Sequence, residues 1–112
     1  MNKCIWKYEL PVDGYMTRID EWIVEPLHIE NQNGMPTLWA LVMPEKQWDG
    51  YTEIVAIGTG WNIPDHILEE WVYMGTCGDG AGYIWHYWGH TVVEEDYMDV
   101  LDDLELTRIA RI

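Results

Sequence analysis

Large apolar side chains alternate with other residues at the start of the chain. In CIWKYEL, residues 4–10, every second position is Cys, Trp, Tyr or Leu. Successive side chains of a strand point to opposite faces, so this period of two predicts a half-buried β-strand, ended by the turn residues PVDG at 11–14. Residues 17–24 form a plausible second strand, which we expect to break at Pro26.

The next apolar segments predict a hairpin. Residues 27–32 and 37–43 are both rich in apolar residues and flank the dipeptide Asn33-Gly34. This dipeptide is typical of the tight turn that joins two antiparallel strands. Pro36 has no backbone N–H, so we expect it to shorten the pairing of the two strands.

The middle of the chain continues the strand pattern. Residues 53–57 are apolar and β-branched, which favours a strand. Residues 71–77 and 83–88 flank a glycine-rich link and predict a second hairpin, with Gly89 ending its second strand. Residues 64–70 begin with Pro and Asp, which favour a helix start, so we expect one or two helical turns there.

The last part of the chain has helical periodicity. Its apolar residues are spaced by three and four positions: Val93, Tyr97, Val100, Leu101 and Leu104. This spacing predicts one apolar stripe of an α-helix. The other face carries seven carboxylates within residues 94–105, with no Lys or Arg among them: Glu94, Glu95, Asp96, Asp99, Asp102, Asp103 and Glu105.

These elements predict a single domain over residues 1–112, because this length is usual for one domain. Residues 1–91 form a β-rich body, and residues 92–112 form an appended helical segment. The expected fold class is α+β and mostly antiparallel β, with about seven short strands in a small barrel or sandwich. A C-terminal acidic amphipathic helix completes it.

The charge of the chain limits its partners. Six Lys and Arg against twenty Asp and Glu give a formal net charge of −14, while 48% of the residues are hydrophobic. This composition predicts a folded protein with a strongly negative surface. We therefore expect no direct binding to nucleic acid and no binding to an anionic membrane.

We infer the expected compartment from the lack of visible targeting signals and from the spacing of the cysteines. The sequence shows neither the apolar region of a signal peptide nor an apolar run long enough to span a membrane, so we expect a cytoplasmic protein. Cys4 and Cys77 lack the spacing of a metal or redox motif. In a reducing compartment they are expected to be buried free thiols.

Four strings of the sequence resemble a known family. In order, and within residues 4–88, they are IWKYEL, NGMPTLWALVMPE, IVAIGTGWNIPD and WVYMGTCGDGAGYIWHYW. The pattern I-W-K-Y-E-L, then P-x-L-W-A, then G-T-G-x-x-I-P, is similar to that of a family of small phage and prophage proteins. The resemblance implies an origin in a mobile element and a compact β-rich body. It implies no activity, and the acidic segment after His90 is not part of it.

The histidines suggest one candidate metal site. His86 and His90 would share one face of a strand, and with His66 or Asp65 they could bind a divalent metal. No third ligand has a motif spacing, so we favour packing roles for these residues. A nucleophilic pair of Cys77 with His86 is compatible with the sequence, but nothing favours one.

Two glycine-rich segments, residues 58–60 and 78–82, resemble phosphate-binding loops in composition only. Neither contains the Lys of such a loop, so we favour turns that need positive φ. The chain contains no Ser, and its residues form no evident catalytic set. We therefore expect a protein without enzymatic activity, cofactor or metal.

The aromatic residues favour a binding surface. Eight Trp and seven Tyr occur without any Phe, and rings with polar edges are enriched at interfaces and in pockets. Tryptophans in predicted strands are expected in the core: Trp6, Trp39, Trp71 and Trp85. Trp48 and Trp61 lie in predicted loops and are expected to be exposed.

The first functional hypothesis rests on the acidic segment. Seven acids over twelve residues span about 18 Å of helix, a linear charge density close to that of duplex DNA. This favours a DNA mimic, a non-enzymatic phage-type inhibitor of host defence, in one form an anti-CRISPR protein, that binds a basic, nucleic-acid-handling host protein. The seven carboxylates are the expected site, with Trp48 and Trp61 as aromatic anchors. The plain alternative is an acidic face that is only solvated.

Two other hypotheses remain open. The protein could be a sponge that captures a nucleotide signal in an aromatic pocket, using stacking and the few Lys and Arg residues. It could also be a phage structural or assembly protein whose apolar helical stripe packs against a second copy, which makes a homodimer.

Overall fold

The structure, a computed structural model, describes residues 2–14, 16–44 and 50–93 of the chain. Its strands form two antiparallel sheets. The first sheet has the order β1-β4-β3, with β1 at Cys4–Glu9, β4 at Met35–Met43 and β3 at Trp22–Gln32. The second has the order β2-β5-β7-β6, with β2 at Met16–Ile19, β5 at Gly50–Gly58, β7 at Ile84–Val93 and β6 at Val72–Gly78.

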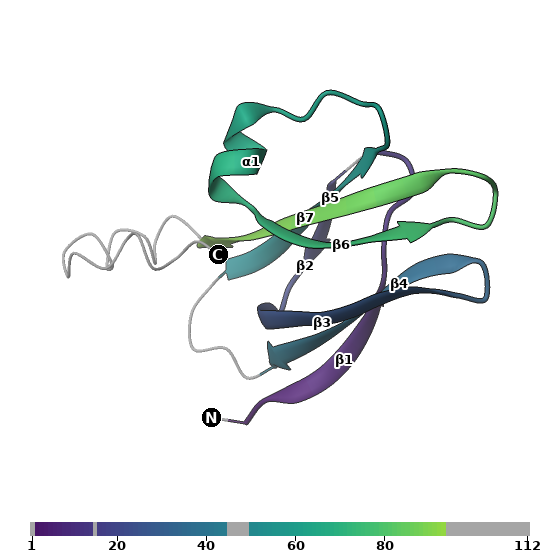
Figure 1. The fold of residues 1–112 in the computed structure, drawn as a ribbon. Helices are drawn as coiled ribbons and strands as arrows, with labels where there is room; N and C mark the ends of the chain where they lie inside the picture. Colours follow the sequence, from purple (N-terminus) through teal and green to yellow (C-terminus); the bar gives the residue numbers. More distant parts are fainter. Residues whose placement is uncertain (1, 15, 45–49, 94–112) are drawn as a thin grey trace.

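The two sheets lie face to face as the layers of a sandwich (Figure 1) and do not close into a barrel. The side chains between them form the main core: Leu10, Ile19, Ile23, Leu38, Ala40, Val42, Ile54, Ala56, Trp85 and Tyr87. Two hydrogen bonds tie this interior to nearby backbone: Thr52 Oγ1 donates to Glu21 O at 3.0 Å, and Tyr87 OH donates to Pro11 O at 2.8 Å. The prediction of a mostly antiparallel β fold is confirmed.

A second, smaller core lies on the other face of the four-stranded sheet. Val55 and Ile57 of β5 point away from the sandwich interior and pack with Ile67 and Trp71. Ile67 belongs to α1 (Asp65–Glu70), which lies over this outer face (Figure 1). Burial on both faces explains why residues 54–57 are uniformly apolar.

Several predicted elements are present as expected. The first strand and the short helix are confirmed at β1 and α1. The hairpin of β3 and β4 turns at Asn33, with φ 54°, and Gly34, with φ 89°. Positive φ at both central residues is what a type I′ turn requires, and Asn-Gly is suited to it. The hairpin of β6 and β7 is also confirmed.

The two proline predictions are wrong. The chain breaks between β2 and β3 at residues 20–21, and Pro26 lies inside β3, between two register shifts. Strand β3 is an edge of its sheet, where a missing N–H and a bulge are tolerated. Pro36 does not shorten the hairpin, because it lies in β4 opposite Asn31.

The expected end of a strand at Gly89 is also wrong. Strand β7 continues through Gly89, which pairs with Ile54 on one side and Val72 on the other. A Cβ atom at this position would lie 2.8 Å from Met74 Sδ. The glycine therefore makes room for a side chain from the neighbouring strand instead of ending its own.

The burial of the tryptophans differs in part from the prediction. Trp71 and Trp85 are buried, at 8% and 5% exposure, as expected. Trp6 is 43% exposed, so its assignment to the core is wrong, and Trp39 is only half-buried. Both lie in the three-stranded sheet. A residue in a strand is buried only where another part of the chain packs on that face of the sheet. Within the described ranges, no helix has the length and apolar character needed to cross a membrane.

Candidate functional site

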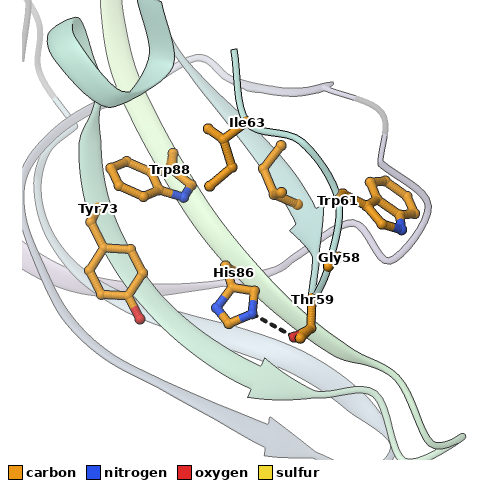
Figure 2. Close-up of a pocket in the computed structure, with 9 residues that line it drawn as sticks. Gly58, Thr59, Trp61, Ile63, Tyr73, His86 and Trp88 are labelled. Carbon is orange, nitrogen blue, oxygen red and sulfur yellow. Dashed lines mark hydrogen bonds between the residues drawn. The ribbon is translucent and has the colours of Figure 1, made fainter. Parts of the chain in front are cut away.

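A pocket of about 460 Å³ opens on the outer face of the four-stranded sheet (Figure 2). This volume falls in the range of small-molecule sites. Nine residues line it: Ile57, Gly58, Thr59, Gly60, Trp61, Ile63, Tyr73, His86 and Trp88. They come from β5, the segment that follows β5, β6 and β7.

Strand alternation places the floor of the pocket. In β7, Trp85 and Tyr87 point into the main core, so His86 and Trp88 point outward. The register sets Tyr73 of β6 directly opposite Trp88. An edge strand thus supplies one wall of the pocket.

The turn after β5 supplies the opposite wall. Trp61 N donates to Gly58 O at 3.0 Å, and Gly60 has φ 89°, a conformation that favours glycine. This turn brings Thr59 over the sheet, and Ile63 follows it on the way to α1. The preferred interpretation of residues 58–60 as a turn is confirmed.

His86 is held at both ring nitrogens. Its Nε2 lies 2.7 Å from Thr59 Oγ1, and its Nδ1 lies 2.9 Å from Thr76 Oγ1. The Tyr73 hydroxyl is in turn hydrogen-bonded to Thr76 Oγ1. These four side chains form one continuous hydrogen-bonded chain across the pocket.

The donor at each contact with His86 depends on which ring nitrogen carries the proton. Thr59 Oγ1 also lies 3.4 Å from Ile84 O. Every side chain of this hydrogen-bonded network therefore has a partner within the site.

Two aromatic rings lie against each other in the pocket. The rings of Tyr73 and Trp88 have centroids 5.2 Å apart and are tilted by 58°. Trp88 Nε1 is buried and has no hydrogen-bond partner among the described residues. The Trp88 ring also packs against the second core.

Trp61 stands at the rim of the pocket. It is 52% exposed, which confirms the predicted exposure, but its indole points away from the other labelled side chains (Figure 2). The ring lies on two glycines: added Cβ atoms at Gly14 and Gly58 would approach it within 2.7 and 2.8 Å. It also meets Trp85 edge-on at 5.3 Å. One side of Trp61 is thus already used for packing.

The histidines do not form a common site. Positions four apart on a strand are separated by about 13 Å, so His86 and His90 cannot bind one ion. His90 Nε2 lies 2.7 Å from Glu53 Oε1, and its ring stacks on Trp71. His66 lies edge-on to Trp71, not beside His86. Within the described residues, no three His, Cys, Asp or Glu side chains form a metal-binding group.

The cysteines are free and half-buried. Cys77 packs against the main core, on the face of β6 opposite to Thr76 and its partner His86. Burial raises the pKa of the Cys77 thiol, whose Sγ donates to Gly78 O at 3.2 Å. This placement does not support a Cys77–His86 nucleophilic pair.

The second glycine-rich segment is a turn organised by Asp79. Its carboxylate accepts hydrogen bonds from Trp85 Nε1 at 3.1 Å, Ala81 N at 2.7 Å and Tyr83 N at 3.3 Å. These donors, the Trp85 N–H first, hold the pKa of Asp79 below its usual value. Gly80 and Gly82 both have positive φ, so the interpretation of this segment as a turn is confirmed.

The predicted site and the observed pocket have little in common. The seven carboxylates of residues 94–105, the expected C-terminal helix and Trp48 lie outside the described residues. Trp61 is the one predicted site residue in the described part of the chain. Sequence reasoning missed Thr59, Tyr73 and His86 as members of one site. In a strand over residues 84–88, alternate side chains share a face, so His86 and Trp88 could be placed together. The sequence has no pattern that places the segment after β5, with Thr59, over that face.

Comparison with known protein families identifies the family of the chain. A family model described as a domain of unknown function, DUF7352, matches residues 1–97. No curated protein and no solved structure matches significantly. The matched range includes both sheets and every residue that lines the pocket.

Proposed function

The chain belongs to the DUF7352 family, whose description gives no activity, and from the geometry of the pocket we propose that it is a small-molecule-binding protein. The ligand lies on the outer face of the four-stranded sheet, between Tyr73 and the segment that follows β5. One observation carries the proposal. A pocket of about 460 Å³ combines apolar walls with a histidine fixed at both nitrogens.

The composition of the pocket supports ligand binding over a packing role. Ligand sites are mostly apolar, with a few fixed polar groups, and here Ile57, Ile63 and Trp88 surround His86. A site whose polar groups are already held in place loses less side-chain entropy when a ligand binds. The hydrogen bonds between His86 and the hydroxyls of Thr59 and Thr76 provide that order before any ligand arrives.

We propose a protein that captures or carries a ligand without transforming it. The Thr59 hydroxyl contacts His86 Nε2, but a catalytic set of this kind has a third group, usually a carboxylate, that orients the imidazole. In this pocket Nδ1 of His86 contacts the Thr76 hydroxyl instead, and none of the nine lining residues is Asp or Glu.

A thermal-shift screen of small aromatic and alkylammonium compounds tests this function. A ligand at 100 times its dissociation constant adds about 2.7 kcal/mol of stability, so a true ligand raises the melting temperature clearly. Tyr73→Ala should abolish the shift, because Tyr73 lines the pocket. Tyr83→Ala is the matched control, since Tyr83 is also exposed, at 66% against 50% for Tyr73, but is not among the residues that line the pocket.

Two results contradict the proposal. One is a screen in which no compound shifts the melting temperature. The other is a set of hits whose shifts survive Tyr73→Ala unchanged, because such compounds bind elsewhere. Circular dichroism of both variants checks that each retains the β fold.

A second candidate function rests on the acidic segment. The seven carboxylates of residues 94–105, without any Lys or Arg between them, repel one another along a predicted helix. We propose that this segment binds a basic, nucleic-acid-handling host protein in the cytoplasm, as an anti-defence inhibitor would. Opposite charges would make the association fast and sensitive to salt.

Charge neutralisation tests the second candidate. In a pull-down from host lysate, the triple variant Asp99→Asn, Asp102→Asn and Asp103→Asn should retain less of the basic partner and show a flatter salt dependence. The matched control neutralises Asp65, Glu69 and Glu70 of α1, so the same number of charges is removed elsewhere. Equal loss in both variants indicates a nonspecific effect of net charge and contradicts the assignment to the tail.

A further inference from the structure

The pocket also indicates the class of its ligand. We propose that it binds an organic cation of the quaternary ammonium type, held against the faces of Tyr73 and Trp88; this inference rests on the proposed function. Two independent features support it. They are the absence of formal charge among the lining residues and the strongly negative charge of the whole chain.

Cation binding on aromatic faces needs no carboxylate in the pocket. The negative π face of Trp or Tyr attracts a cation within about 6 Å of the ring centroid, most strongly when water is excluded. Tyr73 and Trp88 place two such rings 5.2 Å apart in one pocket, with the His86 imidazole beside them. The Trp88 ring also packs against the second core, so Tyr73, which is 50% exposed, supplies the more accessible of the two faces.

The charge distribution selects against anions. None of the nine lining residues is Lys or Arg, so a phosphate would have no charged partner there. The formal net charge is −14, and α1, which follows the pocket wall in the chain, contains Asp65, Glu69 and Glu70 but no Lys or Arg. This field raises the local concentration of cations. The hypothesis of a nucleotide sponge therefore agrees with the aromatic rings of the pocket. It does not agree with the absence of Lys and Arg from the lining.

Hydrogen bonding distinguishes quaternary from primary ammonium ions. A primary ammonium has three N–H groups, and each needs an acceptor when it leaves water. In this pocket both ring nitrogens of His86 are already engaged, so the hydroxyl oxygens of Thr59 and Tyr73 are the only side-chain acceptors among the lining residues for these three N–H groups. A quaternary ammonium has no N–H to satisfy and can bury its methyl groups against Ile57 and Ile63. The pocket thus suits alkylated cations.

A set of three soluble probes tests the ligand class. Choline carries a quaternary nitrogen, 3,3-dimethylbutan-1-ol has the same shape with carbon in place of nitrogen, and AMP carries a ring and a phosphate. Binding is followed by two-dimensional NMR of the full chain, using the indole N–H and backbone signals of the pocket. We expect choline to bind about 2- to 30-fold more tightly than its neutral isostere, the range that one cation–π contact provides. AMP should bind least.

Matched variants of Tyr73 locate the effect. Tyr73→Phe keeps the aromatic face and removes the hydroxyl, so it should retain choline binding. Tyr73→Leu removes one of the two faces and should bring the choline affinity closer to that of the neutral isostere. Tyr83→Leu, outside the pocket, is the control and should change nothing. Tyr73 is 50% exposed on an edge strand, so these substitutions leave the core intact.

The outcomes separate the ligand class from the function. If the alcohol or AMP binds as tightly as choline and Tyr73→Leu weakens it, the cation assignment is overturned while the pocket remains a ligand site. Choline binding that is insensitive to Tyr73→Leu also overturns it. If none of the probes and no compound of the thermal-shift screen perturbs the pocket, both proposals are overturned.

Discussion

His90 stacks on Trp71 with ring centroids 3.7 Å apart and ring planes 14° from parallel. The imidazole is at the same time 2.7 Å from Glu53 Oε1, in a setting where both side chains are mostly buried. Trp71 directly follows α1 in the chain, and His90 lies on β7. The stack therefore fastens the end of the helix to the outer face of the sheet, next to the proposed ligand site.

Removing this ring should cost much of the stability of the domain. Trp71→Ala is expected to lower the free energy of unfolding by about 3–5 kcal/mol, because Trp71 is 8% exposed and belongs to the second core. Trp6→Ala removes the same side chain at 43% exposure and should cost clearly less. Urea unfolding followed by circular dichroism measures both. A cost for Trp71→Ala that is as small as the cost expected for an exposed residue would show that the second core contributes little.

Tyr87 should make the protein sensitive to alkali. Its side chain is fully buried and its hydroxyl donates to Pro11 O, and burial raises its pKa above the ordinary value. The unfolded chain releases this proton near pH 10, whereas the folded protein keeps it. The stability that the neutral hydroxyl provides is thus fully present below about pH 10 and is lost as pH rises further.

Tyr87→Phe tests this linkage. At pH 7 it should cost about 0.5–1.5 kcal/mol, because a hydrogen bond to backbone is lost. Above pH 10 the stability of the wild type should fall more steeply than that of the variant, by up to about 1.4 kcal/mol per pH unit. Part of the slope should remain in the variant, since burial and Glu21 also raise the pKa of Tyr8. The free energy of unfolding is measured in urea at several pH values. If it falls with pH at the same rate in the wild type and in the variant, the role of Tyr87 is refuted.

Gly89 should not tolerate a methyl group. A Cβ atom there would lie 2.8 Å from Met74 Sδ and 3.3 Å from Glu53 O. Gly89→Ala is therefore expected to destabilise the domain by about 1–3 kcal/mol, the usual cost of overpacking. Combining it with Met74→Ala should recover part of that cost, and a double-mutant cycle in urea measures the coupling. Strict additivity of the two substitutions would mean that Met74 is not the obstacle.

The local elements of the fold were predictable because they depend on neighbouring residues. Alternation along residues 4–10 identified β1, and Asn33-Gly34 identified a turn that only positive φ can make. The glycine link at 78–82 was also assigned correctly as a turn. In each case the physical cause is contained within a few adjacent residues, so the sequence alone is enough to show it.

The errors occurred where a distant strand determines the structure. Pro26 was taken as a break, but β3 is an edge strand that needs no hydrogen-bond donor at that position. Gly89 was taken as a strand end, but it accommodates Met74 from the neighbouring strand. Trp6 shares the alternation of a core residue, yet it remains 43% exposed. Sheet order and covering layers are properties of the whole fold.

The amino-acid sequence by itself determined the negative charge, the antiparallel β character and the short-range turns, because these follow from residue type and local backbone preference. Only the tertiary structure decided that Thr59, Tyr73 and His86 meet in one pocket. They come from three different segments, and the contact between Thr59 and His86 joins residues 27 positions apart. Such a meeting depends on the register of β5, β6 and β7, which long-range packing fixes and no local pattern encodes.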